Sequence, residues 1–268
     1  MHKEWKSYSF GRTSRDNMDV YQAEDGGENA IEFVRSGYKA DVIVLFKKMD
    51  FDDLEEALER GYKIVWDCYP RFTPAEAEAL SSKERTFDGC AYAEKALYTN
   101  YYAGLKSIVE SGELGRLTAV KMTSLRNLKN DMLLRRVIAA DLSVLFSLVG
   151  WEQVEDETTT TRRGIAIGNS VMRFPNGVTA NYEYTTEKGK EFSTWEWTFT
   201  GGKIVCNALK GTIRVYKDGA EEKLHQYSVA PKLNLILTDT KKFSQGEKNG
   251  FIPIAKFLHL RKVLLGLR

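Results

Sequence analysis

The pattern of apolar residues changes once along this chain of 268 residues, and that change limits the possible folds most strongly. In the first part, apolar runs of strand length alternate with helical segments. Ala40–Phe46 (ADVIVLF) is a continuous apolar run, as expected for a strand buried on both faces. The acidic segment Asp50–Arg60 has one apolar helical face and stops at Gly61, and Lys63–Asp67 (KIVWD) follows as a second short strand. This alternation predicts a parallel α/β sheet.

Helical signals continue past that sheet. Thr73, with Pro74 and Glu76 after it, gives the spacing of a capping box at the start of a helix. Further along, Tyr101–Ser111 has an amphipathic pattern, and Leu133–Val149 is strongly apolar with helical spacing. Leu117–Thr123 lies between them and predicts a strand.

After Trp151 apolar and polar residues alternate, which is typical of antiparallel strands with one packed face. The expected strands are Gly164–Phe174, Gly177–Thr185, Ser193–Thr200, Gly202–Asn207 and Gly211–Lys217. We predict a truncated Rossmann-like parallel sheet over residues 1–90 and an α+β domain with an open, mostly antiparallel β-sheet over 91–250. We expect residues 251–268 to form a helix that packs back on the protein.

Composition excludes several classes of protein. Hydrophobic residues make up 43% and charged residues 28% of the chain, so it has enough apolar surface to fold. The net charge of +2 gives no reason to expect nucleic acid as a partner. Three scattered cysteines and three distant histidines favour reduced thiols in a cytoplasmic protein without a metal centre. The polar N-terminus does not read as a signal peptide, and no apolar run reaches the about 18 residues that span a bilayer.

Four local patterns, in order, resemble the glucose–fructose oxidoreductase / inositol dehydrogenase (Gfo/Idh/MocA) family. The most specific is Leu105–Leu117 (LKSIVESGELGRL), which is very similar to that family's "lk.li.sGelG.i" segment. The others are the strand and helix of Asp41–Gly61 with Lys63–Val65, the loop Tyr69–Pro70 with Thr73–Leu80, and Met172–Ala180 followed by Gly201–Gly211.

The resemblance implies NAD or NADP on an N-terminal Rossmann domain, a sugar-type substrate at the domain junction, and a C-terminal sheet that makes dimers. However, no G-x-G-x-x-G precedes residue 40, and about one βα unit is missing from the expected pattern. Residues Lys6–Phe10 can form a strand, and Arg12 after it resembles a position that meets an adenosine phosphate. The alternative, a polar turn rich in cations, is the interpretation we favour.

The same resemblance identifies the proton-transfer positions. Tyr69 stands where the family has the lysine of its "EKP" loop, Asp141 matches an aspartate, and Ile138 replaces a histidine. Tyr69 can act as an acid only if a cation such as Lys95 or Arg135 lowers its pKa from about 10; packing at a loop corner is the alternative that we favour. Asp141, inside an apolar helix, is either a site residue or the ion-pair partner of Arg135 or Arg136.

Other candidates lie at expected strand ends. Lys47 follows the first apolar strand and Pro70 ends the "EKP"-like loop, so both are candidates for cofactor binding. Tyr92, Arg126 and Arg135 are candidates for substrate binding; for Lys47 a solvated loop is the alternative. We interpret Trp195 and Trp197 as residues that pack within the sheet or at a dimer interface rather than as a sugar platform.

These observations favour a relative of sugar-type NAD(P)-dependent oxidoreductases whose cofactor loop and catalytic residues are degenerate. The alternative is a non-catalytic protein that binds a sugar or sugar nucleotide, or assembles with a full-length relative through its sheet. The basic apolar tail after Phe251 can lie on a membrane, but packing on its own domain is the interpretation that we prefer.

Overall fold

The computed structural model describes residues 7–9, 19–23, 27–70, 72–73, 75–76, 79, 89–127, 131–151, 155–162, 166–186, 189 and 191–266. It divides into two units, each with its own sheet. The first unit contains residues 1–94 and 233–258, and the second contains 95–232 and 259–268. We expected residues 233–250 in the second domain. They cluster with the first because the chain returns there: Lys63 Nζ donates to the carbonyls of Phe243 and Ser244, at 3.0 and 2.6 Å.

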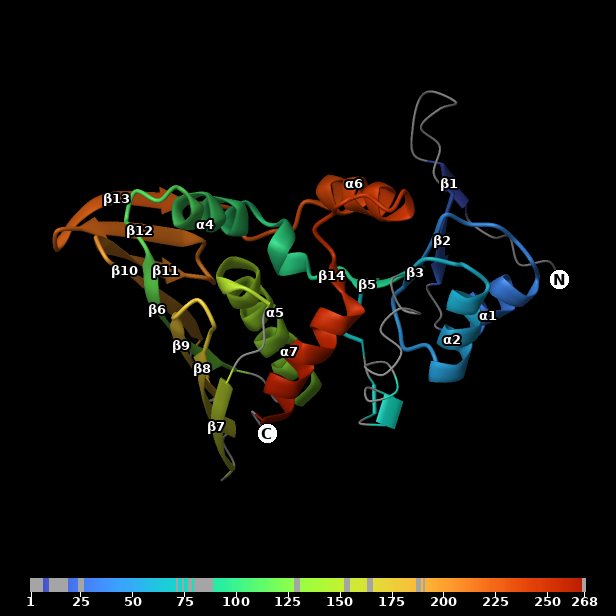
Figure 1. Cartoon of the computed structure of the whole chain (residues 1–268), viewed down its shortest axis with the longest axis horizontal. Helices are drawn as coiled ribbons and strands as arrows, with labels where there is room; N and C mark the ends of the chain where they lie inside the picture. The colour runs from blue at the N-terminus through green and yellow to red at the C-terminus, as the bar shows by residue number, and fades with distance from the viewer. Residues whose placement is uncertain are drawn as a thin grey trace. The chain divides into compact units, whose positions relative to one another are not determined.

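The sheet of the first unit has six described strands, of which the middle four are parallel (Figure 1). The two outer strands, β1 and β14, pair antiparallel with their neighbours. In spatial order the strands are β1 (Ser7–Ser9), β2 (Asp19–Ala23), β3 (Val42–Leu45), β4 (Ile64–Trp66), β5 (Cys90–Tyr92) and β14 (Ile252–Pro253). The predicted small parallel sheet is therefore confirmed.

The order of the parallel strands in space follows their order in the chain. Because crossovers between parallel strands are right-handed, such an order places successive helices on the same face of the sheet. Helices α1 (Gly27–Arg35) and α2 (Phe51–Glu59) do pack together: the Arg35 guanidinium donates to Glu56 Oε2 at 2.9 Å and to Asp53 Oδ1 at 3.1 Å. A doubly wound sheet reverses its strand order and opens its ligand crevice at the reversal. The described parallel strands contain no such reversal.

Strand β2 and helix α1 of this unit were not expected from the sequence. Strand β2 has the sequence DVYQA and helix α1 has GENAIEFVR, and neither shows a long apolar run. The expected helix over Asp50–Arg60 is present as α2. It ends at Gly61, whose φ of +83° lets the amides of Gly61 and Tyr62 donate to the carbonyls of Leu58 and Ala57. The capping box is also present, since Glu76 N donates to Thr73 Oγ1 at 3.2 Å.

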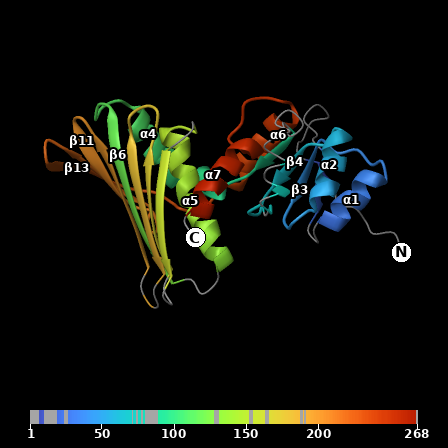
Figure 2. The same ribbon diagram turned by 60° about the horizontal axis from the view of Figure 1, so that its bottom comes forward.

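The second unit contains an open sheet of eight described strands, and helices α4 and α5 lie on one face of it (Figure 2). The helices are a short 3₁₀ turn η1 (Lys95–Tyr98), α4 (Asn100–Glu110) and α5 (Asp131–Val149). In spatial order the strands are β13 (Ala220–Gln226), β12 (Thr212–Lys217), β11 (Gly202–Asn207), β10 (Phe192–Phe199), β6 (Leu117–Arg126), β9 (Thr179–Thr186), β8 (Ala166–Arg173) and β7 (Glu155–Arg162). Only the β6–β9 pair is parallel, so the predicted mostly antiparallel sheet is confirmed.

One face of this sheet is packed and the other is polar. Side chains that alternate along β9 and β10 are buried, among them Tyr182, Trp195 and Trp197. Between them stand residues such as Glu183, Thr194 and Glu196, on the other face. Trp195 and Trp197, 2% and 0% exposed, therefore pack inside the unit.

The chain ends in two further helices, α6 (Leu233–Ser244) and α7 (Ile254–Gly266). Ile254, Phe257 and Leu258 at the start of α7 are buried. Among the described residues, no helix is both long and apolar enough to cross a bilayer.

Candidate functional site

The carboxyl ends of β3, β4 and β5 lie at one edge of the first sheet, where open α/β sheets bind their ligands. Lys47 and Lys48 follow β3, and Lys47 is exposed. Lys48 Nζ lies 3.6 Å from Asp50 and 3.9 Å from a carboxylate oxygen of Glu76, so neighbouring carboxylates surround its charge. Lys47 is therefore placed at the edge where a cofactor would bind, and that role stays a prediction.

The loop after β4 brings Tyr69 against an aromatic side chain of α7. The rings of Tyr69 and Phe257 lie 5.3 Å apart at 68°, and Tyr92 meets the same Phe257 ring at 5.2 Å and 68°. These edge-to-face contacts are the geometry that aromatic pairs prefer. Phe257 is fully buried, and Pro70, next to Tyr69, is buried as well. Tyr69 therefore has a packing role in this unit, and its action as an acid stays a prediction.

A buried carboxylate that was not predicted from the sequence lies at the same edge. Glu94 follows β5, is 5% exposed, and accepts a hydrogen bond of 2.6 Å from the Tyr92 hydroxyl. Tyr92, a predicted substrate-binding residue, is thus bonded to the protein itself. A glutamate placed directly after a buried strand was the available signal. Lys95 comes next and starts η1, while Arg12 lies outside the described residues.

The helices that follow β2 and β3 begin at this edge with acidic residues. Glu28 is in the first turn of α1, and Asp52 and Asp53 are in the first turn of α2, after Asp50 at its N-cap. Carboxylates stabilise a helix N-terminus through the helix dipole. They also place negative charge where a Rossmann domain would direct amide hydrogens at a pyrophosphate.

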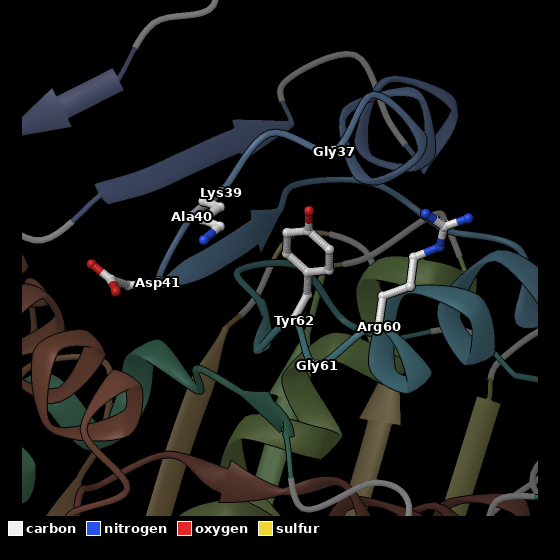
Figure 3. Close-up of a pocket in the computed structure, with 7 residues that line it drawn as sticks. All are labelled: Gly37, Lys39, Ala40, Asp41, Arg60, Gly61 and Tyr62. Atoms are coloured by element: carbon white, nitrogen blue, oxygen red, sulfur yellow. The ribbon is translucent and has the colours of Figure 1, made fainter.

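A pocket with a volume of about 360 Å³ lies at the opposite, amino edge of the sheet (Figure 3). It is lined by Gly37, Lys39, Ala40, Asp41, Arg60, Gly61 and Tyr62. Gly37 and Gly61 follow the C-terminal ends of α1 and α2, where the helix dipoles are negative. Lys39 and Arg60 carry positive charge near these negative helix ends, which explains why cations line the pocket. Arg60 also forms an ion pair with Glu56 at 2.8 Å. The pocket therefore gives no separate sign of a ligand.

The second unit contains a buried polar network centred on Asp141, which is 5% exposed in the middle of α5. Its Oδ2 atom accepts hydrogen bonds from Ser124 Oγ at 2.9 Å and from the Tyr182 hydroxyl at 3.0 Å. Ser124 Oγ is in turn 3.1 Å from Ser193 Oγ. Two strands, β6 and β9, thus bond one carboxylate of α5 directly, and β10 supports it through Ser124.

The ion-pair partner of Asp141 differs from the expected one. Arg126 Nη2 lies 3.8 Å from Asp141 Oδ1, whereas the predicted partners Arg135 and Arg136 are exposed. The pairing prediction was wrong because helical spacing turns those two arginines away from the sheet that Asp141 faces. Burial raises the pKa of Asp141, and this is opposed by the charge of Arg126 and the hydrogen bonds from Ser124 and Tyr182.

Neither a protein-family model nor a curated protein sequence matches the chain. Solved structures do. A dehydrogenase from Chromobacterium violaceum is 13% identical, with 92% of this chain and 84% of that chain covered, at a TM-score of 0.70. UDP-N-acetylglucosamine 3-dehydrogenase from Acidithiobacillus ferrooxidans is 14% identical over 90% and 85%, at 0.65. Biliverdin reductase from Synechocystis, in complex with biliverdin and NADP+, is 12% identical over 88% and 81%, at 0.64.

The chain has the Gfo/Idh/MocA oxidoreductase fold. At these identities the likeness shows the fold alone, and it confirms the fold that the four sequence patterns predicted. The substrates named for these structures differ, so the Gfo/Idh/MocA fold by itself selects no ligand.

The described residues show no glycine turn from strand to helix that would hold a dinucleotide. Gly37 and Gly61, which have positive φ, lie at the C-terminal ends of α1 and α2, and residues 24–26 before α1 lie outside the described residues. The described starts of α1 and α2 carry carboxylates. Within the described residues no group of three or more metal-ligating side chains is present.

Proposed function

We propose that this chain is a relative of NAD(P)-dependent sugar-type oxidoreductases that does not carry out their hydride transfer. The observation that carries this proposal is the acidic start of α2. Asp52 in the first turn of α2, like Glu28 in the first turn of α1, stands at the carboxyl edge of the sheet, the edge where open α/β sheets bind their ligands. A dianionic group next to these carboxylates would be repelled.

The positions for proton transfer support the same proposal. Tyr69, in the place of the family's lysine, packs on Phe257. Ile138, in the place of the histidine, is 3% exposed within the apolar core. Hydride transfer at a carbinol carbon needs a group that takes or gives the hydroxyl proton. Loss of both positions, together with the unfavourable pyrophosphate site, argues against the family's reaction.

The test is a titration of the full chain with NADH and NADPH, followed by nicotinamide fluorescence and by thermal unfolding. A full-length dehydrogenase of the same fold serves as the positive control. We expect no saturable binding by this chain at millimolar cofactor and physiological salt. Saturable one-to-one binding, together with oxidation or reduction of a sugar, would overturn the proposal.

We further propose that the chain binds a sugar or sugar nucleotide. The support is a contrast between the two units. The second unit has a buried carboxylate beside an arginine. The carboxyl edge of the first sheet, with its acidic helix starts, does not favour a pyrophosphate. Assembly through the open sheet, with a second copy or a full-length relative, is also a proposal. The polar face of that sheet carries Lys121, Thr194 and Glu196, and sedimentation of the chain with and without Lys121→Glu tests this assembly.

A further inference from the structure

Arg126, the last residue of β6, has a guanidinium that is buried but incompletely bonded. Its side chain is 11% exposed. The Nε atom is buried and has no hydrogen-bond acceptor among the residues that the structure describes. The 3.8 Å between its Nη2 and Asp141 Oδ1 is also too long for a hydrogen bond. A buried donor on a charged group that lacks an acceptor is costly, so this side chain calls for an explanation.

The carboxylate of Asp141 is held too far from Arg126 to form the missing hydrogen bond. Asp141 Oδ2 is fixed by Ser124 and Tyr182, and Ser124 is fixed in turn by Ser193. Because these groups come from three strands of one sheet, moving Asp141 toward Arg126 would break several buried hydrogen bonds. The Nε–H of Arg126 is therefore left without an acceptor among the described residues, while Nη2 beside it lies 3.8 Å from Asp141 Oδ1.

We propose that Arg126 binds an oxyanion of the ligand, a carboxylate or a phosphate, through its Nε–H and Nη2–H edge. This deepens the proposed sugar or sugar-nucleotide binding and rests on it. Two parallel donors match the two oxygens of such a group, and such charge-assisted pairs are stronger than neutral ones. A small rotation of the guanidinium is needed, since Nε is buried in the ligand-free protein. The ligand class is thus an acidic sugar or a phosphorylated one.

Asp141 has a positioning role in this arrangement. Its Oδ1 lies 3.8 Å from Nη2, beyond hydrogen-bond distance, so it holds the guanidinium nearby without occupying the Nε–H and Nη2–H donors. The competing explanation is that Arg126 serves only as a loose ion pair for Asp141 and takes no ligand.

The experiment observes the Arg126 Nε–H group directly in the full chain by ¹⁵N NMR of arginine side chains. Arg126→Lys, which keeps the charge but removes the fork, assigns the resonance. The probes are inorganic phosphate, D-glucuronate and uncharged D-glucose. The matched control is Arg116→Lys, the same change at the exposed arginine just before β6. We expect phosphate or glucuronate to shift the resonance saturably. In calorimetric titrations with the same anions, we expect Arg126→Lys to weaken binding more than about tenfold and Arg116→Lys to leave it unchanged.

The outcomes separate the ligand chemistries and the two proposals. A response to phosphate alone indicates a phosphorylated sugar, and a response to glucuronate alone indicates an acidic sugar. If neither anion moves the resonance, or if Arg116→Lys weakens binding equally, the inference is overturned. The wild-type spectrum decides this even if Arg126→Lys does not fold. NAD(P)H binding and turnover of a sugar are measured separately. A chain that binds cofactor, oxidises or reduces a sugar and also responds at Arg126 would refute only the proposed loss of hydride transfer.

Discussion

The two units of this chain differ in how they use polar side chains near their expected sites. At the carboxyl edge of the first unit, Tyr69 and Tyr92 pack on Phe257, and the helices begin with carboxylates. In the second unit, a carboxylate is buried below an open sheet and hydrogen-bonded by two strands. The first arrangement stabilises structure without a ligand. In the second unit, the buried charges carry a desolvation penalty that well-packed apolar side chains would avoid.

If the proposed function is right, the two units of this fold have diverged separately. At the carboxyl edge of the first unit, aromatic side chains pack on one another, whereas the second unit keeps buried charges that are hydrogen-bonded. Stability and titration measurements on matched variants can break or sharpen this comparison.

The largest effect is expected when the network in the second unit is broken. Asp141→Ala leaves Arg126 without its counter-charge and Ser124 and Tyr182 without their acceptor, so we expect a loss of about 3–5 kcal/mol in the free energy of unfolding. Hydrogen exchange of α5 peptides measures it. The matched change in the first unit, Asp52→Ala at the exposed start of α2, removes only a helix-dipole contribution of about 0.3–1 kcal/mol. Equal losses for the two variants would contradict the comparison.

A smaller effect is expected when the charge of Asp141 is varied by pH. Because burial raises the pKa of Asp141 in the folded chain, the folded state takes up its proton more readily than the unfolded state. This contribution to stability is present at low pH and is lost as pH rises from the unfolded pKa through the raised folded pKa. Relative to Asp141→Asn, the wild type should therefore gain stability as the pH falls toward 4. Urea unfolding of both proteins across that range measures the trend, and a trend of opposite sign would show that Arg126 outweighs burial.

The sequence predicted the fold well because buried strands and helix ends leave local signals. The run Ala40–Phe46 contains β3, and Gly61 ends α2 at a left-handed residue. Strands β7 and β13 were not predicted, because EDETTTTR and AEEKLHQ have few apolar residues to mark the edges of a sheet. Strand β2 was missed for a similar reason. Its composition gives no strand signal, and its pairing with β3 makes it a strand.

The candidate site was less predictable because its contacts join distant segments. Arg126, Asp141 and Tyr182 each lie in a different element, and no spacing pattern could show that they meet. Phe257 contacts Tyr69 from 188 positions further along the chain. Asp141 was singled out correctly as a charge inside an apolar helix, but its partner depends on which sheet strand lies beneath it.

The smallest effect is expected at the cofactor edge, where Tyr69 and Phe257 should be coupled by ring packing. We expect a double-mutant cycle of Tyr69→Leu and Phe257→Leu to give an interaction free energy of about 0.5–1.5 kcal/mol, measured by urea unfolding. Tyr69→Leu with Phe33→Leu is the control, because Phe33 packs instead on Tyr38 and Tyr62 and should be additive within about 0.5 kcal/mol. If Tyr69 instead faces a ligand, the first cycle would also be additive. The tyrosine would then belong with Asp141 among the groups kept for binding, and the contrast between the two units would disappear.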